Sequence, residues 1–249
     1  MRLAWATDIH LNFLGPVDRR RFLESVKGQA DALVITGDIA ESNSLGENLR
    51  LMSVVLDMPV YFVLGNHDFY RGSVVGTRAD VGEMIRGAEK LVYLTQAGVV
   101  ELTPNTALVG HDGWADARLG DFAGSRVLLN DFVAIRELHR WKDEFTLDKP
   151  ALRRVLHELG DEAAQHLKGI LPEAAQRYPR IIVATHVPPF REAAWYQCQP
   201  SGDDYLPFFS CKAVGEVLRE VAQSYPRCQM LTLCGHTHGG GEVQVLENL

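Results

Sequence analysis

The sequence predicts an α/β fold in which mostly parallel strands deliver polar side chains to one edge of a sheet. Five short apolar runs, rich in β-branched residues, have the composition of strands buried on both faces. They span residues 3–6, 32–35, 60–64, 181–184 and 230–234, and each is followed closely by Asp, Asn or His. Helical periodicity separates the first three runs, which indicates parallel pairing through crossover connections.

The segments between these runs predict helices that pack on the sheets. One follows Asp18, and a second begins at Ser44, whose spacing from Glu47 fits a capping box. Further helices are expected over residues 79–87, 130–142, 151–177 and 211–224. A sixth strand is expected at residues 106–110, and alternating polarity predicts another at residues 242–245.

Composition and charge exclude several classes of protein. A chain of 249 residues, 46% of them hydrophobic, can bury a sizeable core as one domain. Its net charge of −7 disfavours a broad nucleic-acid surface, which requires clustered Lys and Arg. No apolar run approaches membrane-spanning length, and residues 1–4 lead directly into the first strand without a signal peptide, so we expect a cytoplasmic protein.

The polar residues that follow the apolar runs are carboxylates, imidazoles and one amide. They are Asp8, His10, Asp38, Asn66, His186, His236 and His238. Taken singly, each motif also fits a turn, but together they place seven metal-binding side chains where open α/β sheets bind ligands. This donor set suits Mn, Fe or Zn, whereas Ca or Mg would favour oxygen alone. Because seven donors exceed the needs of one ion, we expect two divalent ions, roughly 3.5–4 Å apart, that act on a phosphoryl group.

The order of motifs, D-x-H, G-D, G-N-H-D, a lone H and G-H-x-H, resembles the calcineurin-like metallophosphoesterase superfamily over residues 8–238. The resemblance implies an αββα sandwich, in which two mostly parallel or mixed sheets are flanked by helices, and a single domain over residues 1–249. It implies hydrolysis of a phosphate ester by a hydroxide that bridges the two ions. The first ion would be held by Asp8, His10, Asp38 and His238, and the second by Asp38, Asn66, His186 and His236.

The resemblance gives His67 a different role from its neighbour Asn66. His67 would protonate the leaving oxygen instead of binding metal, a function that contributes about 10²–10⁴-fold to rate. Asp68 is the expected partner that orients this imidazole. We therefore expect His67 and Asp68 to be catalytic.

The expected substrate is a small-molecule phosphate ester, with diesters slightly favoured over monoesters. Protein phosphatases of the superfamily extend the Gly-Asp motif to G-D-x-V-D-R-G, and the corresponding residues 37–42 here lack the Arg. A monoester dianion needs more compensating positive charge than a diester. Arg71 or Arg191 could supply it. Two alternatives remain, a nuclease of the same superfamily and a non-catalytic interaction module, and the oligomeric state is open.

Two further features have two interpretations each, and the cysteines have one. Residues His111 and Asp112 follow the strand at 106–110 and would either face the site or satisfy turn backbone. The aromatic segment at residues 190–209 would form a lid or substrate wall, or else an interface or simple packing. The four cysteines, Cys198, Cys211, Cys228 and Cys234, lack a C-x-x-C motif and are expected to be free, mostly buried thiols.

Overall fold

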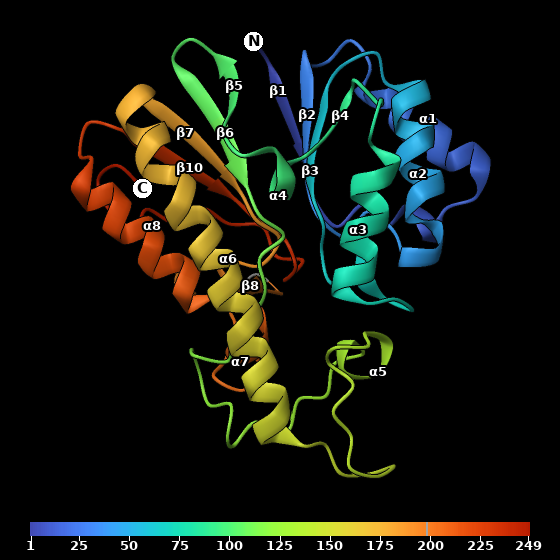
Figure 1. Cartoon of the computed structure of the whole chain (residues 1–249), viewed down its shortest axis with the longest axis vertical. Helices are drawn as coiled ribbons and strands as arrows, with labels where there is room; N and C mark the ends of the chain where they lie inside the picture. The colour runs from blue at the N-terminus through green and yellow to red at the C-terminus, as the bar shows by residue number, and fades with distance from the viewer. Residues whose placement is uncertain (198) are drawn as a thin grey trace.

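Two four-stranded sheets stand face to face, with helices on both outer sides (Figure 1). This arrangement comes from a computed structural model, which describes residues 1–197 and 199–249. The predicted αββα sandwich is therefore confirmed. The prediction that Cys198 is a free thiol lies outside the described residues, whereas Cys211, Cys228 and Cys234 are free as predicted.

The first sheet is entirely parallel and has the strand order β1-β2-β3-β4. Its strands are β1 (Leu3–Ala6), β2 (Ala32–Thr36), β3 (Val60–Val63) and β4 (Leu91–Tyr93). The connections contain α1 (Pro16–Val26), α2 (Ser42–Val55) and α3 (Val74–Met84). Every residue of β2 and β3 is buried, as the continuous apolar runs predicted.

The second sheet has the order β10-β7-β6-β5, and only the β5–β6 pair is antiparallel. Its strands are β5 (Val100–Thr103), β6 (Thr106–Gly110), β7 (Arg180–Ala184) and β10 (Gln229–Leu233). The long helix α6 (Lys149–Arg177) and α8 (Lys212–Ser224) pack on each other and on the outer face of this sheet. Both helices were predicted to within two residues of their observed bounds.

Short elements complete the fold around the carboxyl ends of the strands. They are η1 (Leu11–Phe13), η2 (His67–Phe69), α4 (Leu94–Ala97), α5 (Asp131–Ala134), η3 (Arg191–Ala193), β8 (Trp195–Tyr196), β9 (Gln199–Pro200) and α7 (Leu206–Phe209). In the described parts of the chain, no helix combines the length and apolarity needed to cross a bilayer.

Three apolar layers hold the sandwich together. The middle layer lies between the sheets, where Val34 and Val63 of the first sheet join Leu108 and Ala184 of the second. The outer layers bury one face of α1–α3 and one face of α6 and α8. Full burial of a Leu or Val side chain contributes about 1.5–3 kcal/mol to the stability of the fold. Packing in the middle layer therefore holds the two sheets in their observed arrangement.

The helix predicted over residues 130–142 is wrong except for its first turn, α5. Beyond Ala134 the backbone forms hydrogen bonds with another loop. The amide of Arg71 donates to the carbonyl of Ala134 at 2.8 Å, and the amide of Arg136 donates to the carbonyl of Gly72 at 3.2 Å. These tertiary hydrogen bonds use backbone amide and carbonyl groups that a helix would need. The burial of Phe132, Ile135 and Leu138 at helix-like spacing therefore does not produce a helix.

The strand predicted over residues 242–245 is also wrong. These residues lie in an irregular segment that is largely exposed, and the chain closes in a turn where the amide of Val245 donates to the carbonyl of Leu249 at 2.8 Å. Alternating polarity over four residues therefore did not create a strand. In its place, the buried side chain of Asn248 donates to the carbonyls of Ala222 and Cys228.

Three helix starts also differ from the prediction, and the first is that of α1, which begins at Pro16, two residues before Asp18. Helix α2 begins at Ser42, and the Ser44 hydroxyl donates to the carbonyl of Glu41, so the expected capping box does not start the helix. Helix α3 spans residues 74–84 instead of 79–87, because the side chain of Ser73 caps it by accepting from the amide of Gly76.

Candidate metal centre

All seven predicted metal ligands follow the carboxyl ends of strands, where the two sheets meet. The first sheet supplies Asp8 and His10 after β1, Asp38 after β2 and Asn66 after β3, and the second supplies His186 after β7 and His236 and His238 after β10. Four of these residues, Asp38, Asn66, His236 and His238, line a cavity of about 220 Å³. The fold therefore brings together residues that are more than two hundred positions apart in the chain.

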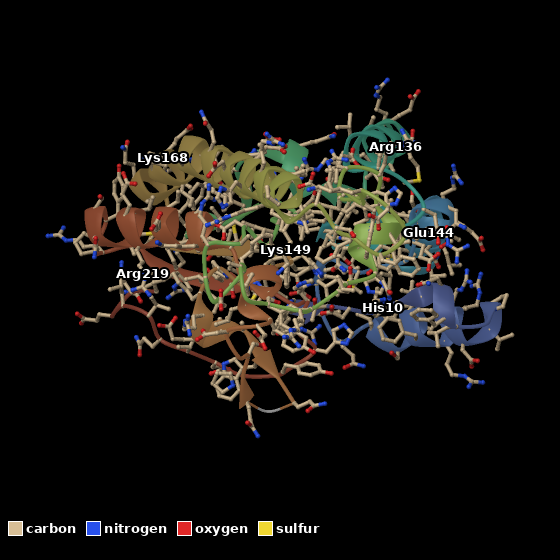
Figure 2. The ribbon with its side chains drawn as sticks, turned by 90° about the horizontal axis from the view of Figure 1, so that it is seen from below. His10, Arg136, Glu144, Lys149, Lys168 and Arg219 are labelled. Atoms are coloured by element: carbon tan, nitrogen blue, oxygen red, sulfur yellow. The ribbon has the colours of Figure 1, made fainter. Side chains whose placement is uncertain are left out.

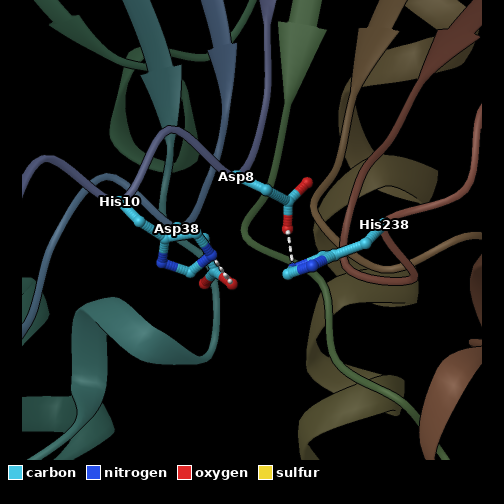
Figure 3. A group of neighbouring side chains, drawn as sticks. All are labelled: Asp8, His10, Asp38 and His238. Carbon is cyan, nitrogen blue, oxygen red and sulfur yellow. Dashed lines mark ion pairs between the residues drawn. The ribbon is translucent and has the colours of Figure 1, made fainter. Parts of the chain in front are cut away.

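Asp8, His10, Asp38 and His238 point toward one another (Figure 3). Their donor atoms all lie within 4.8 Å of one another. His238 Nε2 lies 3.3 Å from Asp8 Oδ1, and His10 Nε2 lies 3.7 Å from Asp38 Oδ2. Two carboxylates and two imidazoles at this spacing match the donor set that Mn, Fe or Zn prefers.

The two carboxylates of this group differ in their electrostatics. Burial, followed by the charge of Asp8, raises the pKa of Asp38 well above its usual value. Burial alone would raise the pKa of Asp8. The hydrogen bond with His238 and the neighbouring imidazoles lower this pKa by more, so the pKa of Asp8 lies below its usual range. Two carboxylates in one buried site favour a cation between them.

His186 and His236 each have one ring nitrogen committed to a backbone carbonyl. His186 Nδ1 lies 2.8 Å from the carbonyl oxygen of Thr36, and His236 Nε2 lies 2.9 Å from that of Phe208. A carbonyl oxygen only accepts, so each neutral imidazole carries its proton on that nitrogen. The other nitrogens, His186 Nε2 and His236 Nδ1, therefore present lone pairs.

Both lone pairs face the amide oxygen of Asn66, at 3.0 Å from His186 Nε2 and 2.9 Å from His236 Nδ1. Asn66 Nδ2 donates to Asp131 Oδ1 at 2.9 Å, so the amide oxygen must face the histidines. Three hydrogen-bond acceptors, His186 Nε2, His236 Nδ1 and the amide oxygen of Asn66, thus converge with no proton between them. A bound cation would satisfy all three. The residues present fit a second metal ion.

Asp38 lies between the two groups of ligands. Its Oδ2 faces His10, and its Oδ1 lies 3.4 Å from His186 Nε2. The backbone amide of His67 donates to the same Oδ1 at 2.9 Å, which holds the carboxylate in place. Asp38 is only 1% exposed. One fixed, buried carboxylate can therefore contact an ion in each group.

Close approach of the strand-end loops depends on Gly37. Its φ of 90° is in the left-handed region, and a Cβ there would lie 2.6 Å from both His186 Nδ1 and the amide nitrogen of Gly65. Only glycine allows the loop of Asp38 to pass this close to both neighbours. The Gly-Asp motif thus has a steric reason for Gly37 in addition to the chemical reason for Asp38.

His67 lines the cavity but belongs to neither group of ligands. Its ring stacks on Tyr70 with centroids 4.3 Å apart and lies 4.7 Å from the ring of His10. Burial, followed by the neighbouring imidazoles of His10, His186 and His238, lowers the pKa of His67 to about 4.

The hydrogen bonds of Asp68 go to backbone amides instead of to the imidazole of His67. Its Oδ1 accepts from Ile39 and Ala40, and its Oδ2 accepts from Gly65, all at 2.8–3.0 Å. Asp68 therefore ties the loop that carries Asp38 to the loop that carries Asn66. Burial, followed by the charge of Asp38, raises the pKa of Asp68 to about 7.

Asp131 and Tyr70 are part of this site although the sequence did not single them out. Both line the cavity, and both contact Asn66. Asp131 lies 65 residues from Asn66 in the chain, and the short apolar run before it at residues 127–129 forms no strand, so no strand-end pattern indicated it. Tyr70 lies two residues after the G-N-H-D motif, and this proximity was the only available signal.

His111 and Asp112 lie behind the ligands and do not line the cavity. Asp112 is fully buried and accepts from the amide of Leu64, from Arg78 Nε and from the hydroxyl of Tyr93, at 2.6–2.8 Å. This carboxylate thus joins the end of β3 to α3 and β4. Its contacts are those of a structural residue.

Part of the aromatic segment at residues 190–209 forms a wall of the cavity. Tyr196 and Phe209 line it, and the Phe209 ring lies 5.3 Å from that of His236 in an edge-to-face arrangement. Tyr205 packs against both aromatic residues, at 5.3 Å from Phe209 and 6.4 Å from Tyr196. The wall thus offers an apolar, aromatic surface beside the candidate metal ligands.

The chain belongs to the calcineurin-like phosphoesterase family, whose sequence model matches residues 1–240. This family defines a class of hydrolases that act on phosphoric esters, and the candidate metal group at the sheet edge agrees with that class. No curated protein matches the chain.

Solved structures share the fold at low identity. Phosphopantetheinyl Hydrolase (PptH) from Mycobacterium tuberculosis is 17% identical, with a TM-score of 0.66 over 95% of this chain and 83% of that one. TT1561 of Thermus thermophilus is 12% identical, with a TM-score of 0.51 over 93% of this chain and 80% of that one. These similarities show that the architecture is common to all three proteins.

Proposed function

We propose that the protein is a dinuclear metal-dependent phosphoesterase that prefers small phosphodiesters to phosphomonoesters. The observation that carries the proposal is the convergence of two ligand groups on Asp38. Asp8, His10, Asp38 and His238 would hold one divalent ion, and Asp38, Asn66, His186 and His236 the other. When bound, the ions supply positive charge to the phosphoryl oxygens and activate a water as the nucleophile.

His67 is proposed to donate a proton to the leaving oxygen. Its position on the cavity wall, outside both ligand groups, is consistent with contact to the ester. Burial keeps the free imidazole neutral at pH 7, since it lowers the pKa to about 4. A bound phosphate ester would place negative charge beside the ring, which favours the protonated imidazole, whereas the two bound ions would favour the neutral one.

The preference for diesters follows from the charges around the cavity. Among the described residues that line it there is no Lys or Arg, whereas Asp38 and Asp131 are acidic. Both cations that were candidates to replace the missing Arg are paired elsewhere. Arg71 Nε lies 2.7 Å from Glu41, and Arg191 lies 2.8 Å from Asp203.

Two further cations also lie away from the candidate ligands. Figure 2 shows Lys168 and Arg219 on the side of the molecule formed by α6 and α8, away from His10. A monoester dianion would thus find no Lys or Arg among the described residues that line the cavity, and a diester carries one negative charge fewer.

A second hollow of about 740 Å³ shares Tyr196 with the cavity, but the cavity itself is small. Its volume of about 220 Å³ lies below the usual range for drug-sized ligands. The aromatic wall of Tyr196 and Phe209 would contact the organic part of the ester while the phosphate lies near the ligands.

The two alternatives have less support. A nuclease would need a cationic groove, which the net charge of −7 and the acidic cavity lining disfavour. A non-catalytic module would have no need for seven converging ligands and a positioned His67.

The test is a metal-reconstitution assay. The purified protein is stripped of metal, reloaded with Mn, Fe, Zn, Ni or Mg, and offered an aryl phosphodiester, the matched aryl monoester, cyclic nucleotides and single-stranded DNA. We expect metal-dependent turnover with a higher kcat/KM for the diester. A higher value for the monoester would refute the substrate preference, and salt-sensitive cleavage of DNA would favour the nuclease. No turnover with any metal would support the interaction module.

A further inference from the structure

Asp131 reaches the metal centre from α5, a short helix that no predicted ligand shares. The residue is only 5% exposed and lines the cavity. One of its oxygens, Oδ1, accepts two hydrogen bonds, from Asn66 Nδ2 at 2.9 Å and from the Tyr70 hydroxyl at 2.6 Å. A single buried atom therefore contacts a candidate metal ligand and a second cavity residue.

The first of these bonds determines which way the Asn66 amide faces. The amide has an accepting oxygen on one side and a donating NH₂ on the other, and a carboxylate can only accept. The NH₂ must therefore face Asp131, and the oxygen must face His186 and His236. The opposite orientation would direct two N–H groups toward the lone pairs of these imidazoles and would repel a cation.

The second bond anchors the Tyr70 ring. The Tyr70 side chain is buried, and its ring stacks on the imidazole of His67 with an interplanar angle of 26°. Because the hydroxyl is held by Asp131, the ring presents a fixed face to His67. Asp131 thus acts through Tyr70 on His67, the residue proposed to protonate the leaving oxygen.

We propose that Asp131 is a positioning residue of the metal centre, directing the amide oxygen of Asn66 to the second ion and holding Tyr70 against His67. The proposal rests on the proposed function, since it requires Asn66 to bind metal and His67 to act on the ester. Partners of metal ligands of this kind typically contribute 10–100-fold to metal affinity or activity.

The test compares Asp131→Asn with Asp131→Leu in the full-length protein loaded with Mn. Asparagine keeps an oxygen that accepts both hydrogen bonds, whereas leucine has a similar volume and no acceptor. Metal retention is followed during titration with a competing chelator, and electron paramagnetic resonance distinguishes a coupled Mn pair from an isolated ion. We expect D131N to retain both ions within about threefold of wild type. D131L should lose its second ion roughly 10–100-fold more readily and give the isolated-ion signal.

Circular dichroism establishes that each variant is folded, and Asp131→Ala replaces D131L with the same expectation if leucine prevents folding. Retention of the coupled pair by the acceptor-free variant would overturn the proposal, as would equal loss of metal in D131N and D131L. A wild-type protein that binds a single Mn would instead refute the dinuclear function, and this proposal with it.

Tyr70→Phe separates the contact with His67 from the contact with Asn66. It removes the hydroxyl but leaves the Asn66–Asp131 hydrogen bond, so both Mn ions should be retained. We expect kcat to fall several-fold for a diester with a weakly acidic leaving group and to change little for one with a strongly acidic leaving group. Equal kcat values for Y70F and wild type on both substrates would refute the role of Tyr70 in holding His67.

Discussion

Five of the seven candidate ligands adopt a left-handed backbone conformation that non-glycine residues usually avoid. They are Asp8, His10, Asp38, His236 and His238, with φ between 41° and 71°. Each such residue costs on the order of 1–3 kcal/mol, and the surrounding structure must stabilise it. Backbone bonds do so here, since the amides of Asp8 and His10 donate to the carbonyls of Gly37 and Asp38 at 3.1 and 2.9 Å. These turns direct the polar side chains toward the shared edge of the two sheets.

At the same scale, His67→Ala should separate catalysis from metal binding. The imidazole lies in neither ligand group, so the variant should keep both ions and its thermal stability. We expect kcat to fall about 10²–10⁴-fold for an ester with a weakly acidic leaving group, and less for one whose leaving group needs little protonation. The measurement is kcat on both esters, alongside metal content. Loss of an ion in this variant would show that His67 is a ligand.

At the scale of elements, the strands that carry the candidate ligands were predictable because the information is local. Apolar runs of four or five residues predicted β2, β3 and β7, and the residues that follow them include Asp38, Asn66 and His186. Residues 130–142 were not predictable, because their backbone bonds to Arg71 and Gly72 come from elsewhere in the chain. Asp131 escaped prediction for the same reason, since only the folded chain brings it to Asn66.

The turn after β2 provides a test at this scale, in Gly37→Ala with Gly28→Ala as its matched control. Both glycines have positive φ, but a Cβ at Gly28 would meet nothing within 4 Å. We expect G28A to lower the free energy of unfolding by about 1–2 kcal/mol through backbone strain alone. G37A should cost clearly more and weaken metal binding, because its Cβ would collide with His186. Urea unfolding of both variants checks this, and equal costs would contradict the steric role of Gly37.

At the scale of the whole molecule, the candidate metal centre lies where the two sheets meet. The first sheet provides the carboxylates and the amide, and the second provides three of the four imidazoles. The hydrogen bond from His186 Nδ1 to the carbonyl of Thr36 crosses directly between the sheets. The candidate site therefore forms only when the two sheets pack against each other. Substitutions between the sheets should consequently affect metal binding.

His111 should make the stability of the whole chain sensitive to acid. Burial lowers the pKa of His111 to about 3, whereas an unfolded histidine titrates near 6.5. Between these values the unfolded chain binds a proton that the folded chain does not, so stability falls as the pH decreases from 6.5 toward 3. Asparagine can replace Nδ1 as the acceptor from the amide of Gly113. H111N should therefore flatten the pH dependence of urea unfolding, and the exposed His139→Asn should not. Parallel profiles for H111N and wild type would refute this assignment.

The central claim is that Asp38 joins two metal ions, and metal analysis by mass spectrometry during activity measurements tests it most directly. We predict two ions per chain in fully active wild-type protein. Asp38→Ala should lose both ions, whereas His10→Ala should lose mainly one, because His10 faces only the first group of ligands. A fully active wild type with one ion per chain, or an Asp38→Ala variant that keeps both, would contradict the account.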